Sequence, residues 1–197
     1  MRSLFATCWY NKCVSYLEQQ FLIAMPGMED PNFTRGVTLL CQHNDDGALG
    51  ITINRPSEFT MADVLGQIGI ACNAEDLAHV PVFEGGPVHP ERGFVLHDGE
   101  PKWESSMRVG DNIAITTSRD ILEAIADGTG PEKYLMALGY AGWGAGQLED
   151  EMRDNAWLNV MARADIVFDL PPEQRWEQAV ASLGINVGSL QPAGGHA

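Results

Sequence analysis

The chain has 197 residues, of which 27 are acidic and 12 are basic, so its formal net charge at pH 7 is −15. A chain of this length is typical of one domain that buries roughly 70% of the surface exposed by its unfolded form. The basic residues are scattered and no apolar run approaches the roughly 20 residues that span a bilayer, which disfavours nucleic-acid binding and membrane insertion.

The first third of the chain predicts short strands joined by tight turns, because its apolar runs are short and rich in β-branched residues. The three strands are predicted at 21–25, 37–43 and 48–54. The sequence Asn-Asp-Asp-Gly at 44–47 would join the last two as a β-hairpin. Thr60 and Asp63 have the spacing of a capping box, which predicts a helix that continues to about Ile68.

The rest of the chain mixes strands with helices. Further strands are predicted at 80–84, 92–97, 112–117, 134–140 and 166–168, and helices at 119–127, 146–155 and 172–183. Ser118 is expected to cap the first of these helices, and the glycine- and proline-rich segment 85–90 is expected to be a rigid loop. Hairpins combined with segregated helices indicate an α+β fold.

The stretch 139–151 predicts the end of a strand, a glycine-rich turn and a helix that opens near Gln147. Such a corner can bind a phosphate at the helix N-terminus. No Lys-Ser/Thr pair follows the glycines, however, and three carboxylates in the first turn would repel an anion. We therefore interpret the stretch as a tight structural corner packed against Trp143.

Cys41 and His43 are two residues apart on a predicted strand, so their side chains should share a face. Such a pair could supply a thiolate nucleophile or two metal ligands. No further ligands lie at a supporting spacing, and a free Cys often acts as a small apolar side chain. We expect no metal, no cofactor and no catalytic residue, and retain His43 as a polar-site candidate. His97 is interpreted as a strand-end histidine bonded to the backbone.

Arg55 is the most distinctive candidate for a binding residue, because it is one of few cations and lies between Asn54 and Pro56 in a stiff turn. It could bind a carboxylate or phosphate bidentately. The alternative is an internal ion pair with one of three carboxylates, namely Glu84, Glu149 or Glu151. The glycines before Pro87 could likewise offer backbone N–H groups to an anion, or simply form a sharp turn.

Strand-end loops often carry binding groups, and three such loops contain Arg55, the segment 85–88 and Trp143. We expect these loops to share one rim of the sheet and to form a common site. Its candidate residues are His43, Asn54, Arg55, Gly85, Gly86, Pro87, Trp143, Gln147 and Glu149.

Four motifs in this order resemble the AlgH/YqgE family of bacterial proteins. They are FLIAMP at 21–26, the segment 50–56 ending in Asn-Arg-Pro, GGPV at 85–88, and GYAGW at 139–143 with QLE at 147–149. The resemblance, which runs from about Tyr16 to the C-terminus, implies an α+β domain with a branched, mainly antiparallel sheet. That sheet would partly close into a small barrel surrounded by helices. No chemistry is implied, and some family members carry only the label of transcriptional regulator.

From the resemblance we expect an N-terminal extension at 1–15, a single domain at 16–190 and a flexible tail at 191–197. The N-terminus lacks a clean apolar core and a cleavage site, and the four cysteines lack a framework spacing, so we expect a cytoplasmic protein. The favoured role is binding or regulation through an unidentified protein partner or small ligand, without direct DNA contact and without a membrane. The alternative is an enzyme or small-ligand binder whose site surrounds Arg55, 85–88 and Trp143.

Overall fold

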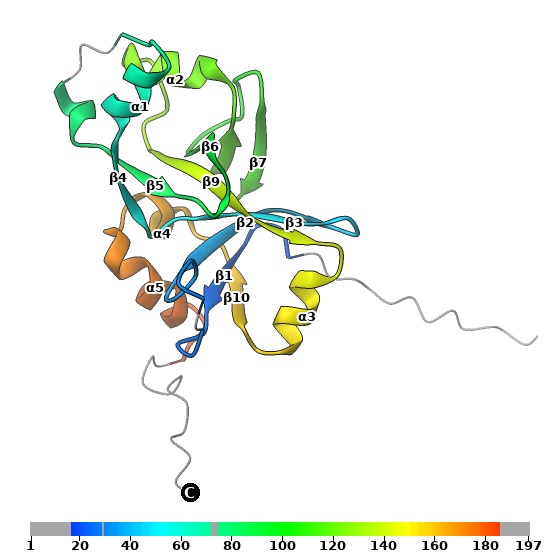
Figure 1. Ribbon diagram of the computed structural model, residues 1–197. Coiled ribbons are helices and arrows are strands. Elements are labelled where there is room, and N and C mark those ends of the chain that lie inside the picture. The colour runs from blue at the N-terminus through cyan, green and yellow to red at the C-terminus, as the bar shows by residue number, and fades with distance from the viewer. Residues whose placement is uncertain (1–16, 29, 72–74, 186–197) are drawn as a thin grey trace, which may run out of the picture.

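The computed structural model describes residues 17–28, 30–71 and 75–185 (Figure 1). The expected N-terminal extension at 1–15 and tail at 191–197 lie outside these residues, as do three of the four cysteines, Cys8, Cys13 and Cys72. None of the helices in the described ranges has the length and apolar character needed to cross a membrane.

Ten strands form one branched sheet, and nearly all of their pairings are antiparallel. The strands are β1 Gln20–Ala24, β2 Val37–Asn44, β3 Gly47–Thr52, β4 Pro56–Thr60, β5 Pro81–Glu84, β6 Val88–His97, β7 Ser106–Gly110, β8 Ile113–Thr116, β9 Tyr134–Gly144 and β10 Trp157–Met161. The main path runs β10-β1-β2-β3-β9-β6-β8-β7. A branch of β4 and β5 joins β9 through the parallel pair β5–β9. The sheet curls into a half-barrel, which confirms the predicted α+β class and the branched, mainly antiparallel sheet.

Helices cover the sheet at both ends of the molecule (Figure 1). They are α1 Met61–Gln67, the 3-10 helix η1 Glu75–Ala78, α2 Arg119–Ala126, α3 Gln147–Arg153, α4 Ala164–Phe168 and α5 Pro172–Ala181. Three apolar clusters fill the spaces between the layers: one against α1 and α2, one against α4 and α5, and one against α3. Alternate residues of β1 enter the last two clusters, so this strand is buried on both faces, which explains its continuous apolar run.

β9 is the central strand, because it pairs with β3, β5 and β6. It continues four residues beyond the predicted end at Tyr140, since Gly144 still pairs with Gly47. The predicted glycine-rich turn is therefore wrong in extent, and only Ala145 and Gly146 separate the strand from α3. The glycines inside β9 serve a close approach: a Cβ on Gly139, whose φ is +71°, would lie 2.4 Å from a backbone oxygen of the segment after β5.

The hairpin of β2 and β3 is confirmed, as is the capping box at the start of α1, where Thr60 and Asp63 bond reciprocally. The predicted strand at 166–168 is wrong: these residues belong to α4, because a short apolar run does not separate a strand from one helical turn. Ser118 occupies the expected cap position before α2, but its hydroxyl donates to Asp120 instead of capping the helix. Strands β4, β7 and β10 were not predicted, and β6 already begins at Val88, inside the expected loop.

Candidate functional site

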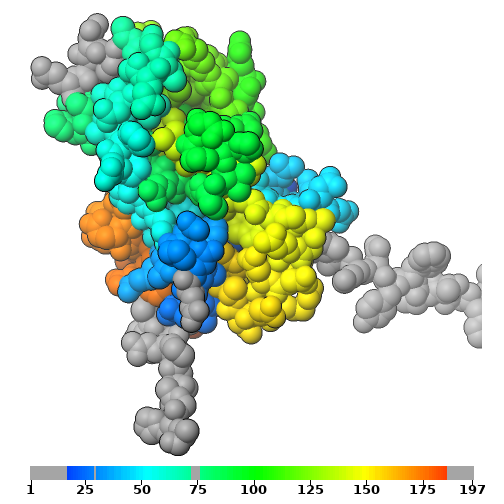
Figure 2. All heavy atoms as spheres, viewed as in Figure 1, coloured from blue at the N-terminus to red at the C-terminus, as the bar shows by residue number. Residues whose placement is uncertain are grey.

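Arg55 lines a pocket of about 290 Å³ that lies between the β1–β2 connection, β4 and the segment that follows β5. The pocket is lined by Asn32, Arg55, Ser57, Phe59, Glu84, Gly86, Pro87, Pro90 and Leu138. In the space-filling view these segments meet where the cyan, blue and green surfaces adjoin (Figure 2). The structure therefore brings together two of the three predicted loops, those that carry Arg55 and Pro87.

The Arg55 guanidinium spans two backbone carbonyls of the β1–β2 connection. One terminal nitrogen donates to the Pro31 carbonyl at 2.7 Å and the other donates to the Thr34 carbonyl at 2.8 Å. The Nε atom is buried and has no hydrogen-bond partner among the described residues. The expected ion pair with Glu84, Glu149 or Glu151 is not formed, and the hydrogen-bond partners of the guanidinium among the described residues are backbone carbonyls.

Asn54, the neighbour of Arg55, has a structural position. Its Oδ1 accepts a hydrogen bond from the Val37 N–H at 2.8 Å, and its Nδ2 donates to the Arg35 carbonyl at 2.9 Å. Asn54 and Arg55 thus both anchor the β1–β2 connection, and Asn54 is not among the residues that line the Arg55 pocket.

The glycines after β5 hold two backbones in close contact. The Gly85 N–H donates to the Leu138 carbonyl at 2.8 Å, so it is not available to an anion. A Cβ on Gly86, whose φ is +154°, would lie 2.2 Å from the backbone of Tyr140. The structure therefore assigns Gly85 and Gly86 to the crossing over β9, and this crossing places Pro87 at the wall of the pocket.

Trp143 and Gln147 belong to a different region, the corner between β9 and α3. The indole N–H groups of Trp143 and Trp157 both donate to Oε2 of Glu151, at 2.9 and 2.8 Å. Gln147 donates to the other oxygen of Glu151 and accepts from the Gly144 N–H. Both tryptophans are almost fully buried, and Phe33 packs against both rings. We call this group of residues the Glu151 network.

His43 is buried beside the same helix. Its Nδ1 accepts a hydrogen bond from the Leu17 N–H at 2.9 Å, so Nε2 carries the proton of the neutral ring and donates to Glu149 at 3.0 Å. Glu149 and Glu151 face different partners, as expected from their spacing on α3. His43, Glu149 and the Glu151 network therefore tie α3 to the hairpin and to the start of the described chain.

The expectation that Cys41 and His43 share a face is wrong. A β-bulge between Leu40 and Gln42 makes Cys41 an extra residue in the ladder, so the alternation shifts after it. Cys41 packs in the cluster against α4 and α5, whereas His43 contacts α3 on the other face. Burial raises the pKa of the Cys41 thiol to about 12, which disfavours the thiolate.

Among the residues of the described ranges, no three His, Cys, Asp or Glu side chains lie close enough together to hold a metal ion. His97 agrees with its interpretation as a strand-end histidine: Nδ1 donates to the Asp98 carbonyl at 2.8 Å. Its Nε2 then accepts from the Thr116 hydroxyl at 2.9 Å, and burial holds the pKa of His97 below its ordinary value.

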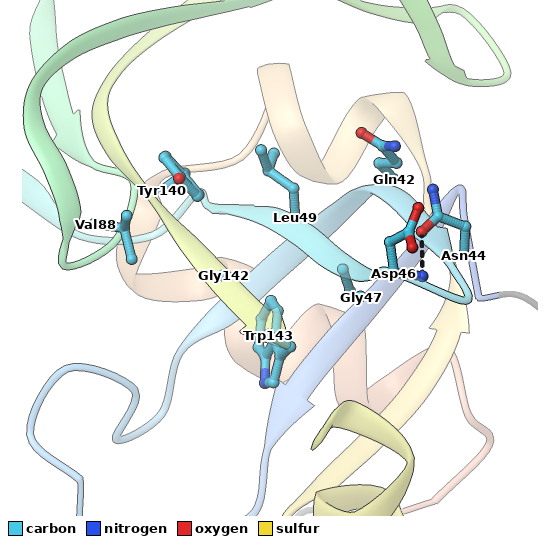
Figure 3. Close-up of a pocket in the computed structure, with 10 residues that line it drawn as sticks. Gln42, Asn44, Asp46, Gly47, Leu49, Val88, Tyr140, Gly142 and Trp143 are labelled. Atoms are coloured by element: carbon cyan, nitrogen blue, oxygen red, sulfur yellow. Dashed lines mark hydrogen bonds between the residues drawn. The ribbon is translucent and has the colours of Figure 1, made fainter. Parts of the chain in front are cut away.

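Another hollow, of about 470 Å³, follows the hairpin and the end of β9 (Figure 3). Trp143 and Leu49 both line it, but they point in opposite directions (Figure 3) and pack in different apolar clusters. Trp143 is not among the residues that line the Arg55 pocket.

The sequence did not identify five of the pocket residues: Asn32, Ser57, Phe59, Pro90 and Leu138. They come from the β1–β2 connection, β4, β6 and β9, and only the fold brings these segments together. A local signal exists for one of them, since Phe59 is a large apolar residue on a strand that is otherwise polar, and its side chain is 46% exposed.

Comparisons with known proteins agree with the fold. Residues 21–188 match a family model described as AlgH-like. UPF0301 proteins of Thioalkalivibrio sulfidiphilus and Methylococcus capsulatus are 54% and 51% identical, over 93% and 94% of this chain and 98% and 99% of their own lengths. The solution structure of the AlgH protein from Pseudomonas aeruginosa is 48% identical, with a TM-score of 0.77 and full coverage of both chains. A crystal structure from Corynebacterium diphtheriae, 18% identical over 89% of this chain and 92% of its own, shares the fold with a TM-score of 0.71.

Proposed function

Since the chain belongs to the AlgH-like family, which the sequence motifs had already indicated, its fold alone assigns no activity, and we propose that it is a binding protein whose site is the Arg55 pocket. The observation that carries this proposal is the position of Arg55. Arg55 lines a pocket in a strongly acidic protein, yet its side chain forms no ion pair with a described carboxylate. A cation held in this way is suited to bind a carboxylate or a similar group of a ligand.

Binding of a small ligand fits the described surface better than a large apolar interface does. Among the described residues, the exposed large apolar side chains are on or next to different elements; they are Phe59, Ile68, Met107, Met161 and Ile185. Stable protein interfaces usually have a contiguous apolar centre. A regulatory role would then depend on the occupancy of the pocket, in the cytoplasm and without a membrane.

Direct DNA binding is opposed by the charge. The chain has a net charge of −15, and most of its arginines and lysines in the described ranges are already paired with a nearby carboxylate. Phosphate contacts require cations that can displace counterions. We expect no sequence-selective gel shift with pure protein at physiological salt. A salt-sensitive, sequence-selective complex would contradict this part of the proposal.

An enzyme with a Cys–His pair has no support from the geometry, because Cys41 is buried and His43 lies on the opposite face of the sheet. A hydrolase or metal-dependent activity would need another set of groups. The site itself, as built from the described residues, offers one cation, one carboxylate, the neutral polar residues Asn32 and Ser57, and a mainly apolar wall, which suits recognition more than catalysis.

The proposal can be tested by equilibrium dialysis of the pure protein against a small-molecule extract of bacterial cells, with mass spectrometry of what is retained. We expect retention of one or a few compounds by the natural protein and loss of retention in Phe59→Ala. Met107→Ala is the matched control, because Met107 is also 46% exposed but lies on β7, outside the pocket. Equal retention by natural protein and Phe59→Ala would exclude the pocket as the site.

A further inference from the structure

We propose that the Arg55 pocket binds a free α-amino acid with an apolar side chain, a class of ligand that has a carboxylate and an ammonium group on one carbon. This inference rests on the proposed binding function and adds the chemistry of the ligand. Three features of the pocket carry it: a pair of opposite charges that do not neutralise each other, apolar walls, and a small volume.

The two charges are held side by side by the backbone. Glu84 is the last residue of β5 and Arg55 directly precedes β4, and the Glu84 N–H donates to the Arg55 carbonyl at 2.8 Å. Both residues line the pocket. No ion pair joins these two side chains, and the Glu84 carboxylate, which is exposed, accepts no hydrogen bond from any described residue. Two adjacent opposite charges without mutual contact can each bind the oppositely charged group of a zwitterion.

Arg55 retains donors for a ligand. A guanidinium carries five N–H groups, and the carbonyls of Pro31 and Thr34 use one on each terminal nitrogen. Each terminal nitrogen therefore keeps a second N–H. The two carbonyl contacts fix the plane of the guanidinium before a ligand arrives, which lowers the conformational entropy lost on binding a carboxylate.

Apart from Asn32 and Ser57 and the two charged residues, the wall of the pocket is apolar. Phe59, Pro87 and Leu138 line it together with Pro90, and the two prolines are rigid. Its volume of about 290 Å³ lies near the lower end of the roughly 300–1,000 Å³ that is usual for small-molecule sites. A ligand with one apolar side chain fits these dimensions, and a dinucleotide does not.

The net charge of the protein selects a zwitterion over an anion. A phosphate or dicarboxylate would be repelled at long range by a chain with a net charge of −15, and a simple cation would be repelled locally by Arg55. A free α-amino acid carries no net charge near neutral pH, so it can approach without that penalty and then use both charges inside the pocket.

The test uses the full chain labelled with ¹⁵N and titrated with four probes: L-leucine, L-phenylalanine, N-acetyl-L-phenylalanine and phenethylamine. Amide shifts are followed at the pocket. We expect saturable shifts at Gly86 and Leu138 with the two free amino acids. The acetylated probe lacks the ammonium group and phenethylamine lacks the carboxylate, so each should bind at least about tenfold more weakly.

A pair of charge-matched variants locates the ammonium contact. Glu84→Gln should weaken binding of the preferred amino acid at least about tenfold, and it should not weaken binding of the acetylated probe, an anion that the Glu84 carboxylate can only repel. Glu58→Gln is the control, because Glu58 is an exposed carboxylate on β4 that does not line the pocket. Both variants keep the size of the side chain and remove no described hydrogen bond, so both should fold.

The outcomes separate the two proposals. If the acetylated probe or phenethylamine shifts the pocket amides as strongly as the amino acids do, or if Glu84→Gln has no effect, the zwitterion inference is overturned while the pocket remains a binding site. If no amino acid shifts these amides but dialysis retains another compound in a Phe59-dependent way, the inference again fails alone. If neither experiment detects a ligand, the proposed function fails as well.

Discussion

The Glu151 network and the Arg55 pocket are both built at the end of a strand, next to glycines, from charged and aromatic side chains. In the network every polar group has a partner: Glu151 accepts from two indoles and from Gln147, which in turn accepts from the Gly144 N–H. At the pocket, each terminal nitrogen of Arg55 keeps one N–H without a described partner, and the Glu84 carboxylate accepts no hydrogen bond from a described residue.

Whether a polar group is already paired within the fold distinguishes structural groups from binding groups more reliably than its residue type does. Buried polar groups are normally paired, because an unpaired one has a high desolvation cost. A set that is fully paired internally, such as the Glu151 network, gains nothing from a ligand. A set with spare donors and acceptors at a pocket can form new hydrogen bonds and ion pairs with a ligand. Trp143 and Gln147 were attractive candidates by type, and their partners now assign them to the fold.

The strongest test of the comparison is Glu151→Ala. It leaves the buried indole N–H groups of Trp143 and Trp157 without an acceptor. Each stranded donor costs roughly 1–3 kcal/mol, so for the two indoles we expect the free energy of unfolding to fall by about 2–6 kcal/mol in urea titrations. Glu151→Gln should cost less, because the amide keeps one oxygen.

Asp150→Asn is the matched control on the same helix. Asp150 pairs with Arg153 at 2.6 Å, but both side chains are largely exposed, so the change should stay within about 1 kcal/mol. Similar losses for Glu151→Ala and Asp150→Asn would show that the indole contacts do not stabilise the corner. They would also remove the contrast with the pocket.

The next test is Arg55→Gln, which removes the bridge to the carbonyls of Pro31 and Thr34. Both of those residues are exposed, so water can replace the lost donors, and we expect a smaller loss of about 1–2 kcal/mol in the free energy of unfolding. Arg55→Lys keeps the charge without the fork and should recover part of any lost ligand binding. A loss as large as that of Glu151→Ala would identify Arg55 as chiefly structural.

The features that the sequence predicted well are local. The hairpin of β2 and β3 follows from its turn residues, and the start of α1 follows from the reciprocal bonds of Thr60 and Asp63. The overall sheet was predicted only through the resemblance to a family. Strand β10 was not predicted: Asp154 and Asn155 do form a turn before it, but the predicted helix at 146–155 was extended over that turn, and Trp157–Met161 becomes a strand by pairing with β1.

The errors come from contacts between distant segments. The glycines of β9 were interpreted as a turn, but they allow the segment at Gly86 to cross the strand, and that crossing is invisible in a linear sequence. The bulge at Cys41 reverses the face of His43, and no residue type announces a bulge. For the pocket, Arg55 and Pro87 could be predicted as strand-end residues, whereas Phe59 and Leu138 join them only in the fold.

The smallest predicted effect concerns a third buried polar group, His97, which is fully paired like the Glu151 network. Its neutral ring donates from Nδ1 to the Asp98 carbonyl and accepts at Nε2 from Thr116, and burial lowers its pKa. Below about pH 6.5 the unfolded chain binds a proton at this position that the folded state binds less readily. The stability contributed by neutral His97 is therefore lost as the pH falls through that window.

We expect the free energy of unfolding to decrease between pH 7.5 and 5.5, by no more than about 1.4 kcal/mol per pH unit for this single proton. His97→Gln should flatten the pH dependence whatever its effect on stability at pH 7.5. His79→Gln, at an exposed position, should keep the slope of the natural protein. If His97→Gln retains that slope too, acid sensitivity resides in other groups. A buried polar group would then not become acid-sensitive merely because it is fully hydrogen-bonded. The comparison between the Glu151 network and the Arg55 pocket would rest on the Glu151 and Arg55 variants alone.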